Sequence, residues 1–104
     1  MNVTDPVVRK NEALRRYEIV VEGELAGFSE YNVLANGMLF THTEVLPAFE
    51  GRGLSSALIR GALQDIRSLH THVIPVCQFV AAYLRKHPED HDLVAPESRR
   101  AFGI

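Results

Sequence analysis

A chain of 104 residues is the size of a single domain, and an apolar content of 46% with 23% charged residues is ordinary for a globular protein. The formal net charge is -2 and there is no basic block, which argues against nucleic acid as the main partner. No apolar run reaches the roughly 18 residues of a membrane span, the first residues lack the pattern of a secretory signal, and a lone cysteine cannot form an internal disulfide. The sequence therefore predicts a soluble, cytoplasmic protein.

The first half of the chain has the pattern of an antiparallel meander. Segments rich in β-branched and aromatic residues alternate with turn signals, of which Asn36-Gly37 is typical of a hairpin. Gly27 falls inside the third segment, where a glycine indicates a bulge or a close backbone approach. The predicted strands cover residues 7–9, 16–21, 25–33 and 38–45.

In the second half the hydrophobic period changes. Apolar residues from Leu54 to Leu69 recur at three- and four-residue spacing, which predicts a helix with one apolar stripe. Residues 71–76 predict a short strand, parallel to the strand at 38–45 because a helical crossover joins them. Pro75 cannot donate a hydrogen bond to the ladder, so we expect the sheet to open there. A second helix is expected around residues 79–84, ending before His87-Pro88.

We expect residues 1–91 to form the domain and residues 92–104 to be a polar tail, with partial disorder from Glu89 onward. The five histidines are scattered over predicted loops and lack the spacing of a zinc site, so no metal is expected.

The connection between the strand at 38–45 and the following helix contains Gly51-Arg52-Gly53. Strand, glycine turn and helix is the order in which backbone N–H groups and a helix N-terminus face a phosphate. The segment matches neither the P-loop nor the dinucleotide fingerprint. Taken alone, the glycines are equally explained by the geometry of the turn.

Four segments in order resemble the GNAT superfamily of N-acetyltransferases, and more closely its small single-domain, acyl-CoA-binding branch. They are His42-Thr43-Glu44-Val45, Glu50-Gly51-Arg52-Gly53-Leu54, Pro75-Val76-Cys77-Gln78-Phe79-Val80 and Tyr83-Leu84-Arg85-Lys86-His87-Pro88. The Arg or Gln of the superfamily loop is replaced by Ala48, and Gln78 stands where the branch usually has Pro.

This resemblance implies an α/β fold of the α+β type, with a mixed, mostly antiparallel sheet, one helical crossover and a second helix. It implies that acetyl-CoA, or another acyl-CoA, binds in the wedge between two splayed parallel strands. Backbone N–H groups from Phe49 to Leu54, with the helix N-terminus, would hold the pyrophosphate, and Arg52 or Arg60 would add charge. Strand N–H groups beside Val45 would polarise the acyl carbonyl. The implied cofactor-binding residues are Val45, Phe49, Glu50, Gly51, Arg52, Gly53, Leu54, Ser55 and Cys77.

Four residues are candidates for catalysis. His42 and Glu44 are two apart on one strand, so they share a face, and either is a candidate general base for an amine; the alternative is a structural pair. Tyr83 resembles the superfamily tyrosine that protonates the leaving thiolate, and its alternative is a core aromatic residue. Cys77 is a candidate nucleophile or a residue that lines the wedge, and the alternative is a buried, inert thiol.

The resemblance implies an acetyl-CoA-dependent N-acetyltransferase acting on an amine, with the amine, the acyl preference and the oligomeric state left open. The alternatives are a non-catalytic acyl-CoA-binding module and an interaction domain whose glycine turn binds nothing.

Overall fold

The computed structural model describes residues 5–104. Its elements are β1 (Val7–Asn11), β2 (Arg16–Val21), β3 (Glu24–Leu34), β4 (Gly37–Val45), the 3-10 helix η1 (Pro47–Phe49), α1 (Leu54–Ser68), β5 (Val73–Pro75), α2 (Gln78–Lys86), the 3-10 helix η2 (Pro88–Leu93) and α3 (Pro96–Arg99). The predicted strands and the two main helices are confirmed in type and order, and so is the predicted α/β fold class.

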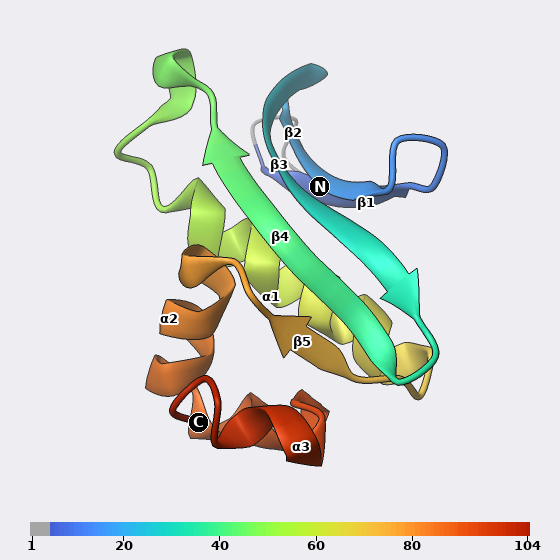
Figure 1. Ribbon diagram of the computed structural model, residues 1–104. Coiled ribbons are helices and arrows are strands. Elements are labelled where there is room, and N and C mark those ends of the chain that lie inside the picture. The colour runs from blue at the N-terminus through green and yellow to red at the C-terminus, as the bar shows by residue number, and fades with distance from the viewer. Residues whose placement is uncertain (1–4) are drawn as a thin grey trace.

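The five strands form one sheet in the order β1-β2-β3-β4-β5. Strands β1 to β4 are antiparallel neighbours, and β5 pairs in parallel with β4 after the chain has crossed through α1. Figure 1 shows α1 behind the sheet and α2 beside the point where β4 and β5 diverge. The predicted meander and the predicted parallel strand are therefore both confirmed.

The core lies between the sheet and α1. Alternate residues of β2, namely Tyr17, Ile19 and Val21, are buried and face the apolar stripe of α1. Such burial contributes roughly 1.5–3 kcal/mol for each large apolar side chain. Leu69 was expected to continue the stripe, but it is exposed because the helix ends at Ser68 and Leu69 forms the C-cap.

Two bulges interrupt the antiparallel ladder. Ala26 in β3 and Thr41 in β4 are each an extra residue without a partner across the ladder. Gly27 lies beside the first bulge, and a Cβ atom there would lie 2.6 Å from the Glu44 carbonyl oxygen. Both interpretations of Gly27, as a bulge site and as a close backbone approach, are thus confirmed.

The bulge at Thr41 reverses which side chains of β4 face the core. Phe40 is buried against α1, and strict alternation from Phe40 would send His42 inward as well. The extra residue instead turns Thr43 inward, with 4% of it exposed, and leaves His42 and Glu44 on the opposite, exposed face.

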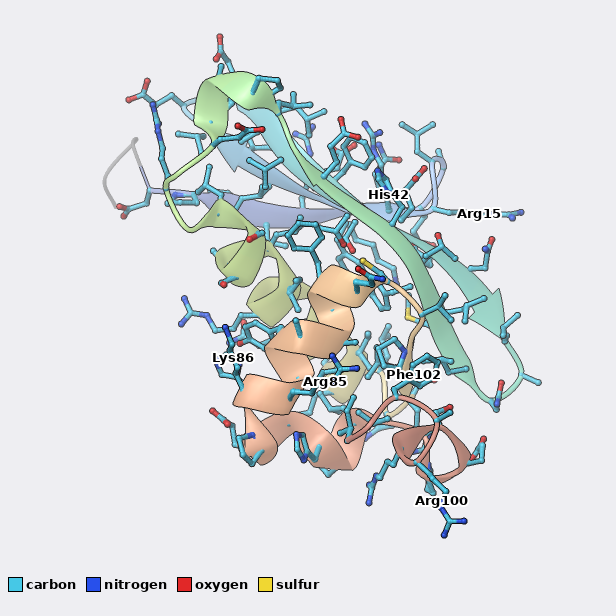
Figure 2. The ribbon with its side chains drawn as sticks, turned by 60° about the vertical axis from the view of Figure 1, so that its left-hand side comes forward. Arg15, His42, Arg85, Lys86, Arg100 and Phe102 are labelled. Carbon is cyan, nitrogen blue, oxygen red and sulfur yellow. The ribbon has the colours of Figure 1, made fainter. Side chains whose placement is uncertain are left out.

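The end of the chain is packed, which contradicts the partial disorder expected from Glu89 onward. Leu93 and Val94 are buried, and Val94 forms a parallel bridge with Val73. The Nε and Nη2 atoms of Arg85 donate to the carbonyl of Phe102 at 3.2 and 2.9 Å, and Figure 2 shows the two residues side by side. Three apolar residues at 93–95 are too few to show a hydrophobic period, so their burial could not be predicted from the sequence. The division of the chain at residue 91 stays a prediction.

The sheet face away from α1 is polar and contains one buried carboxylate. Glu18 is 2% exposed and accepts hydrogen bonds from Arg9 Nε at 2.8 Å, Arg16 Nε at 2.8 Å and Asn11 Nδ2 at 3.1 Å. Burial by itself raises the pKa of the Glu18 carboxyl, but the hydrogen bonds from Arg9 and Arg16 outweigh it, so this pKa lies below its ordinary value of 4.5.

We predict that Glu18→Gln lowers the free energy of unfolding at pH 7 by about 1.5–3 kcal/mol, the range for hydrogen bonds to a charged group. Because the folded-state pKa is depressed, this stabilisation is present above the unfolded pKa and is lost as the pH falls through the folded one. Urea unfolding at pH 7 and near pH 3 therefore gives a gap between variant and parent that shrinks in acid. Glu30→Gln, on the same face, is the control, and a gap independent of pH would contradict the prediction.

Candidate functional site

Strands β4 and β5 separate after a short parallel pairing. Only Met38–Phe40 of β4 pair with β5. The N–H of Cys77 donates to the Phe40 carbonyl at 2.7 Å, and this last contact is the vertex from which the two strands diverge. Beyond it, residues 41–45 have a strand partner only on the β3 side within residues 5–104. Alternate backbone N–H groups of this edge are therefore open toward the gap. The opening expected at Pro75 is confirmed.

A cavity of about 380 Å³ occupies this gap, between the free edge of β4 and the start of α1. Part of its lining comes from the 46–53 connection, which lies at the upper end of β4 in Figure 1. The structure thus brings together all of the sequence-predicted ligand residues except Arg52 and Cys77. The lining residues are Thr43, Glu44, Val45, Phe49, Glu50, Gly51, Gly53, Leu54, Ser55 and Phe79.

The glycine turn directs its free N–H groups at the cavity. Gly51 and Gly53 have φ angles of 79° and 69°, which favour glycine, and Gly53 is the N-cap of α1. The N–H groups of Phe49 and Glu50 are used inside η1, where they donate to Leu46 and Pro47. The N–H groups of residues 51–54 form no hydrogen bond of good geometry with a backbone carbonyl in the described chain. The predicted anion-binding segment is thereby narrowed from residues 49–54 to residues 51–54 and the first turn of α1.

The charges around the turn suit an anion at its N–H groups. The first turn of α1 contains no acidic residue, so nothing within the helix competes for its positive end. Arg52 lies beside the cavity, with its guanidinium 5.4 Å from the centre of the Phe49 ring. Glu50 lines the cavity as well, but its side chain is exposed and free to point into water.

His42 and Glu44 lie on the exposed face of β4 and touch each other. His42 Nε2 and Glu44 Oε1 are 3.2 Å apart, and the two side chains are 53% and 48% exposed. Figure 2 shows His42 on the sheet, well away from α2. Of the two, only Glu44 lines the cavity, so it lies between the gap and the open face of the sheet. His42 reaches the cavity only through its contact with Glu44.

Tyr83 does not line this cavity. Its ring stacks on His87 with 3.8 Å between centroids and an angle of 11°, and it borders two further hollows of about 180 and 420 Å³ along α1 and α2. Burial, and secondly the charge of Asp90, raises the pKa of the Tyr83 hydroxyl. The geometry therefore places Tyr83 in the wall of a groove that continues from the cavity through Ser55 and Phe79.

Cys77 is the N-cap residue of α2 and is 5% exposed. Its Sγ donates to Thr43 Oγ1 at 3.2 Å, so the thiol points at the wall of the cavity from behind. It does not line the cavity in this structure.

Two lining residues were missed by the sequence analysis. Phe79 was expected only as part of the apolar pattern of the second helix, but it is 57% exposed and borders the cavity. Its spacing of four residues from the buried Tyr83 fits a core stripe, so the pattern carried no sign of this exposure. Thr43 gave no signal, because only the bulge at Thr41 turns it inward.

The histidines near the end of α2 have structural partners. His87 Nδ1 contacts the Tyr83 carbonyl at 2.7 Å and His91 Nε2 contacts the Leu84 carbonyl at 2.6 Å. Within residues 5–104 no three His, Cys, Asp or Glu side chains are placed to hold a metal ion. None of the helices described there has the length and apolar character needed to cross a membrane.

Comparison with known proteins identifies the fold. The sequence profile of the GCN5-related N-acetyl-transferase family matches residues 16–93, which is well over half of the chain. The solution structure of a GCN5-like protein from Staphylococcus aureus superimposes with a TM-score of 0.65 at 20% identity, covering 90% of each chain. A search of curated proteins finds no match.

We predict that Gly53→Val abolishes binding of coenzyme A, measured by calorimetry, because a branched side chain blocks the approach of a phosphate to the N–H groups of the turn. Gly23→Val is the matched control. Gly23 has a φ of 81° and, like Gly53, open space where a Cβ would be, but it lies in the β2–β3 turn. Both variants carry the same backbone strain, and unchanged affinity in a folded Gly53→Val protein contradicts the prediction.

Proposed function

Because the chain belongs to the GCN5-related N-acetyltransferase family, we propose that it binds acetyl-CoA and transfers the acetyl group to an amine. The observation that carries the proposal is the single cavity that joins the free edge of β4 to the glycine turn and the start of α1. One end of this cavity suits a phosphate and the other a carbonyl group.

The residues present fit the phosphate end of coenzyme A. The N–H groups of residues 51–54 are without backbone acceptors in the described chain, and the positive end of α1 adds to their field. The groove then continues between α1 and α2, where Lys86 and Arg60 border the two further hollows. We propose that these cations face the nucleotide end, in compensation for Ala48 at the superfamily's Arg or Gln position.

The acyl end would lie along residues 41–45. Open N–H groups on that edge can donate to the thioester carbonyl and stabilise the negative charge that develops on its oxygen. In the transfer, the amine nitrogen forms a bond to the carbonyl carbon and the carbon–sulfur bond breaks with its electron pair on sulfur. The proton lost by the amine goes to Glu44, which borders the cavity, or to His42 through it.

We propose direct transfer from acetyl-CoA to the amine, without an acetyl-cysteine intermediate. The Cys77 thiol is buried, donates to Thr43 and does not line the cavity, so its sulfur is poorly placed to attack a thioester there. We assign no proton transfer to Tyr83 for the same reason of position.

A second candidate is the non-catalytic acyl-CoA-binding module. It is favoured by the exposure of His42 and Glu44, because no helix of residues 5–104 covers their face of the sheet and encloses an acceptor there. Both candidates require acyl-CoA binding, and only transfer separates them.

We predict that acetyl-CoA near 100 times its Kd stabilises the protein by about 2.7 kcal/mol. With a panel of alkylamines, arylamines and peptides, the protein should also release free thiol from acetyl-CoA above the hydrolytic background.

Glu44→Gln should lower kcat roughly 10²–10⁴-fold, as loss of a general base does. Glu24→Gln, a distant exposed glutamate on β3, is the control. Binding without thiol release across the panel would favour the binding module, and absence of binding would refute both candidates.

We predict that Cys77→Ala and Cys77→Ser keep most of the turnover, and that the intact protein gains no acetyl mass during the reaction. The serine variant preserves a donor toward Thr43 and so separates loss of the thiol from loss of that hydrogen bond. An acetyl adduct that forms and decays at the turnover rate, and disappears with activity in both variants, would establish the covalent route instead.

A further inference from the structure

A buried group of three side chains lies behind the wall of the cavity, outside the chemistry proposed above. Thr43 Oγ1 is 2.8 Å from Ser29 Oγ and 3.2 Å from Cys77 Sγ. Ser29 is fully buried, and Thr43 and Cys77 are 4% and 5% exposed. Of the three, only Thr43 also lines the cavity. A hydroxyl that is almost wholly buried and borders a cavity is an unusual feature for an inner sheet face.

The three groups carry three hydrogens that can be donated, and their partners determine where each one goes. Ser29 Oγ and Cys77 Sγ each have Thr43 as their single side-chain partner in residues 5–104. If Thr43 donated to Ser29, the hydrogen of the fully buried Ser29 would have no acceptor, which costs about 1–3 kcal/mol. Thr43 Oγ1 has two lone pairs, so it can accept from both neighbours.

This assignment leaves the hydroxyl hydrogen of Thr43 without an acceptor in the described protein. Thr43 is the one member of the group that borders the cavity, so a ligand there is the acceptor that we infer for this hydrogen. Along β4, Thr43 lies between the vertex at Phe40 and the turn after Val45. A ligand held by its phosphates at residues 51–54 and extended along β4 brings its far end to Thr43.

We propose that the Thr43 hydroxyl donates a hydrogen bond to the carbonyl oxygen of the bound acyl thioester, and that the hydrogen bond with Ser29 holds it in that orientation. The inference rests on the acyl-CoA binding proposed above. The carbonyl oxygen is the expected acceptor because a divalent sulfur accepts only weakly. Thr43 would then be a catalytic residue beside the backbone N–H groups of β4, and Ser29 a positioning residue.

The test compares two ligands that differ only at the carbonyl group. Acetyl-CoA and its thioether analogue S-ethyl-CoA have the same size, and calorimetry gives the ratio of their affinities. Thr43→Val, which removes the hydroxyl at nearly constant shape, should lower the preference for acetyl-CoA by roughly 2- to 12-fold, the worth of one net hydrogen bond. Thr43→Ser, which keeps the hydroxyl, should retain the preference. Thr43→Ala replaces the valine variant if the latter does not fold.

Ser29→Ala tests the direction of the hydrogen bonds. If Ser29 holds the Thr43 hydroxyl by donating to it, Ser29→Ala frees that hydroxyl to rotate, and the ratio of affinities should fall toward that of Thr43→Val. An unchanged ratio would refute the positioning role of Ser29. A ratio that rises in Ser29→Ala would mean that Thr43 donates to Ser29 in the parent, and it would overturn the assignment.

The remaining outcomes separate this inference from the proposed function. If the parent binds neither ligand, the proposed function fails and the inference with it. If both ligands bind and Thr43→Val leaves their ratio unchanged, only the role of Thr43 fails. A lower ratio in Thr43→Val, together with a parent-like ratio in Thr43→Ser, supports it.

Discussion

The single extra residue at Thr41 determines which side chains of β4 face the core side of the sheet and which face water. An unbulged β4 would continue the alternation from Phe40, burying His42 and Glu44 in an apolar core and exposing Thr43. Burying a carboxylate and an imidazole in that apolar core would cost several kcal/mol. With the bulge, the carboxylate and the imidazole face water on one side of the strand, while the hydroxyl of Thr43 faces the cavity on the other. One backbone irregularity therefore separates the candidate proton acceptor from the candidate carbonyl-binding group.

The bulge works together with the early end of β5. Pro75 is the last residue of that strand, and the hydrogen bond from Cys77 to Phe40 fixes the vertex from which the two strands diverge. Since the free edge of β4 starts at this vertex, the length of the pairing sets how deep a ligand can extend. The packed end of the chain supports the arrangement, because Val94 bridges Val73 and holds β5 from its other side.

The uncovered sheet face is polar, and side-chain contacts connect its strands. Glu18 ties β1 to β2 through Arg9 and Asn11. It also binds Arg16 within β2, and the Arg16 guanidinium lies 4.5 Å from the centre of the Phe28 ring on β3. These contacts link three strands on a face that no helix of residues 5–104 covers. A small domain can thus present an uncovered surface beside its cavity, and an acceptor amine can approach Glu44 without displacing a structural element.

Local patterns in the sequence determined the elements and the general position of the site. Alternation, the three- and four-residue period, Pro75 and the two glycines of the turn each act over a few neighbouring residues, so they predicted the strands, the crossover helix and the splay. The family resemblance implied nine cofactor-binding residues, and seven of them line the cavity. Tertiary structure decided the rest. Thr43 meets Ser29 and Cys77 from 14 and 34 residues away, Tyr83 turns to the groove rather than the cavity, and residues 93–95 are buried only because β5 offers them an edge. A bulge has no reliable local signature, since it satisfies the packing on both faces of a sheet at once, and those faces exist only after the strands have paired.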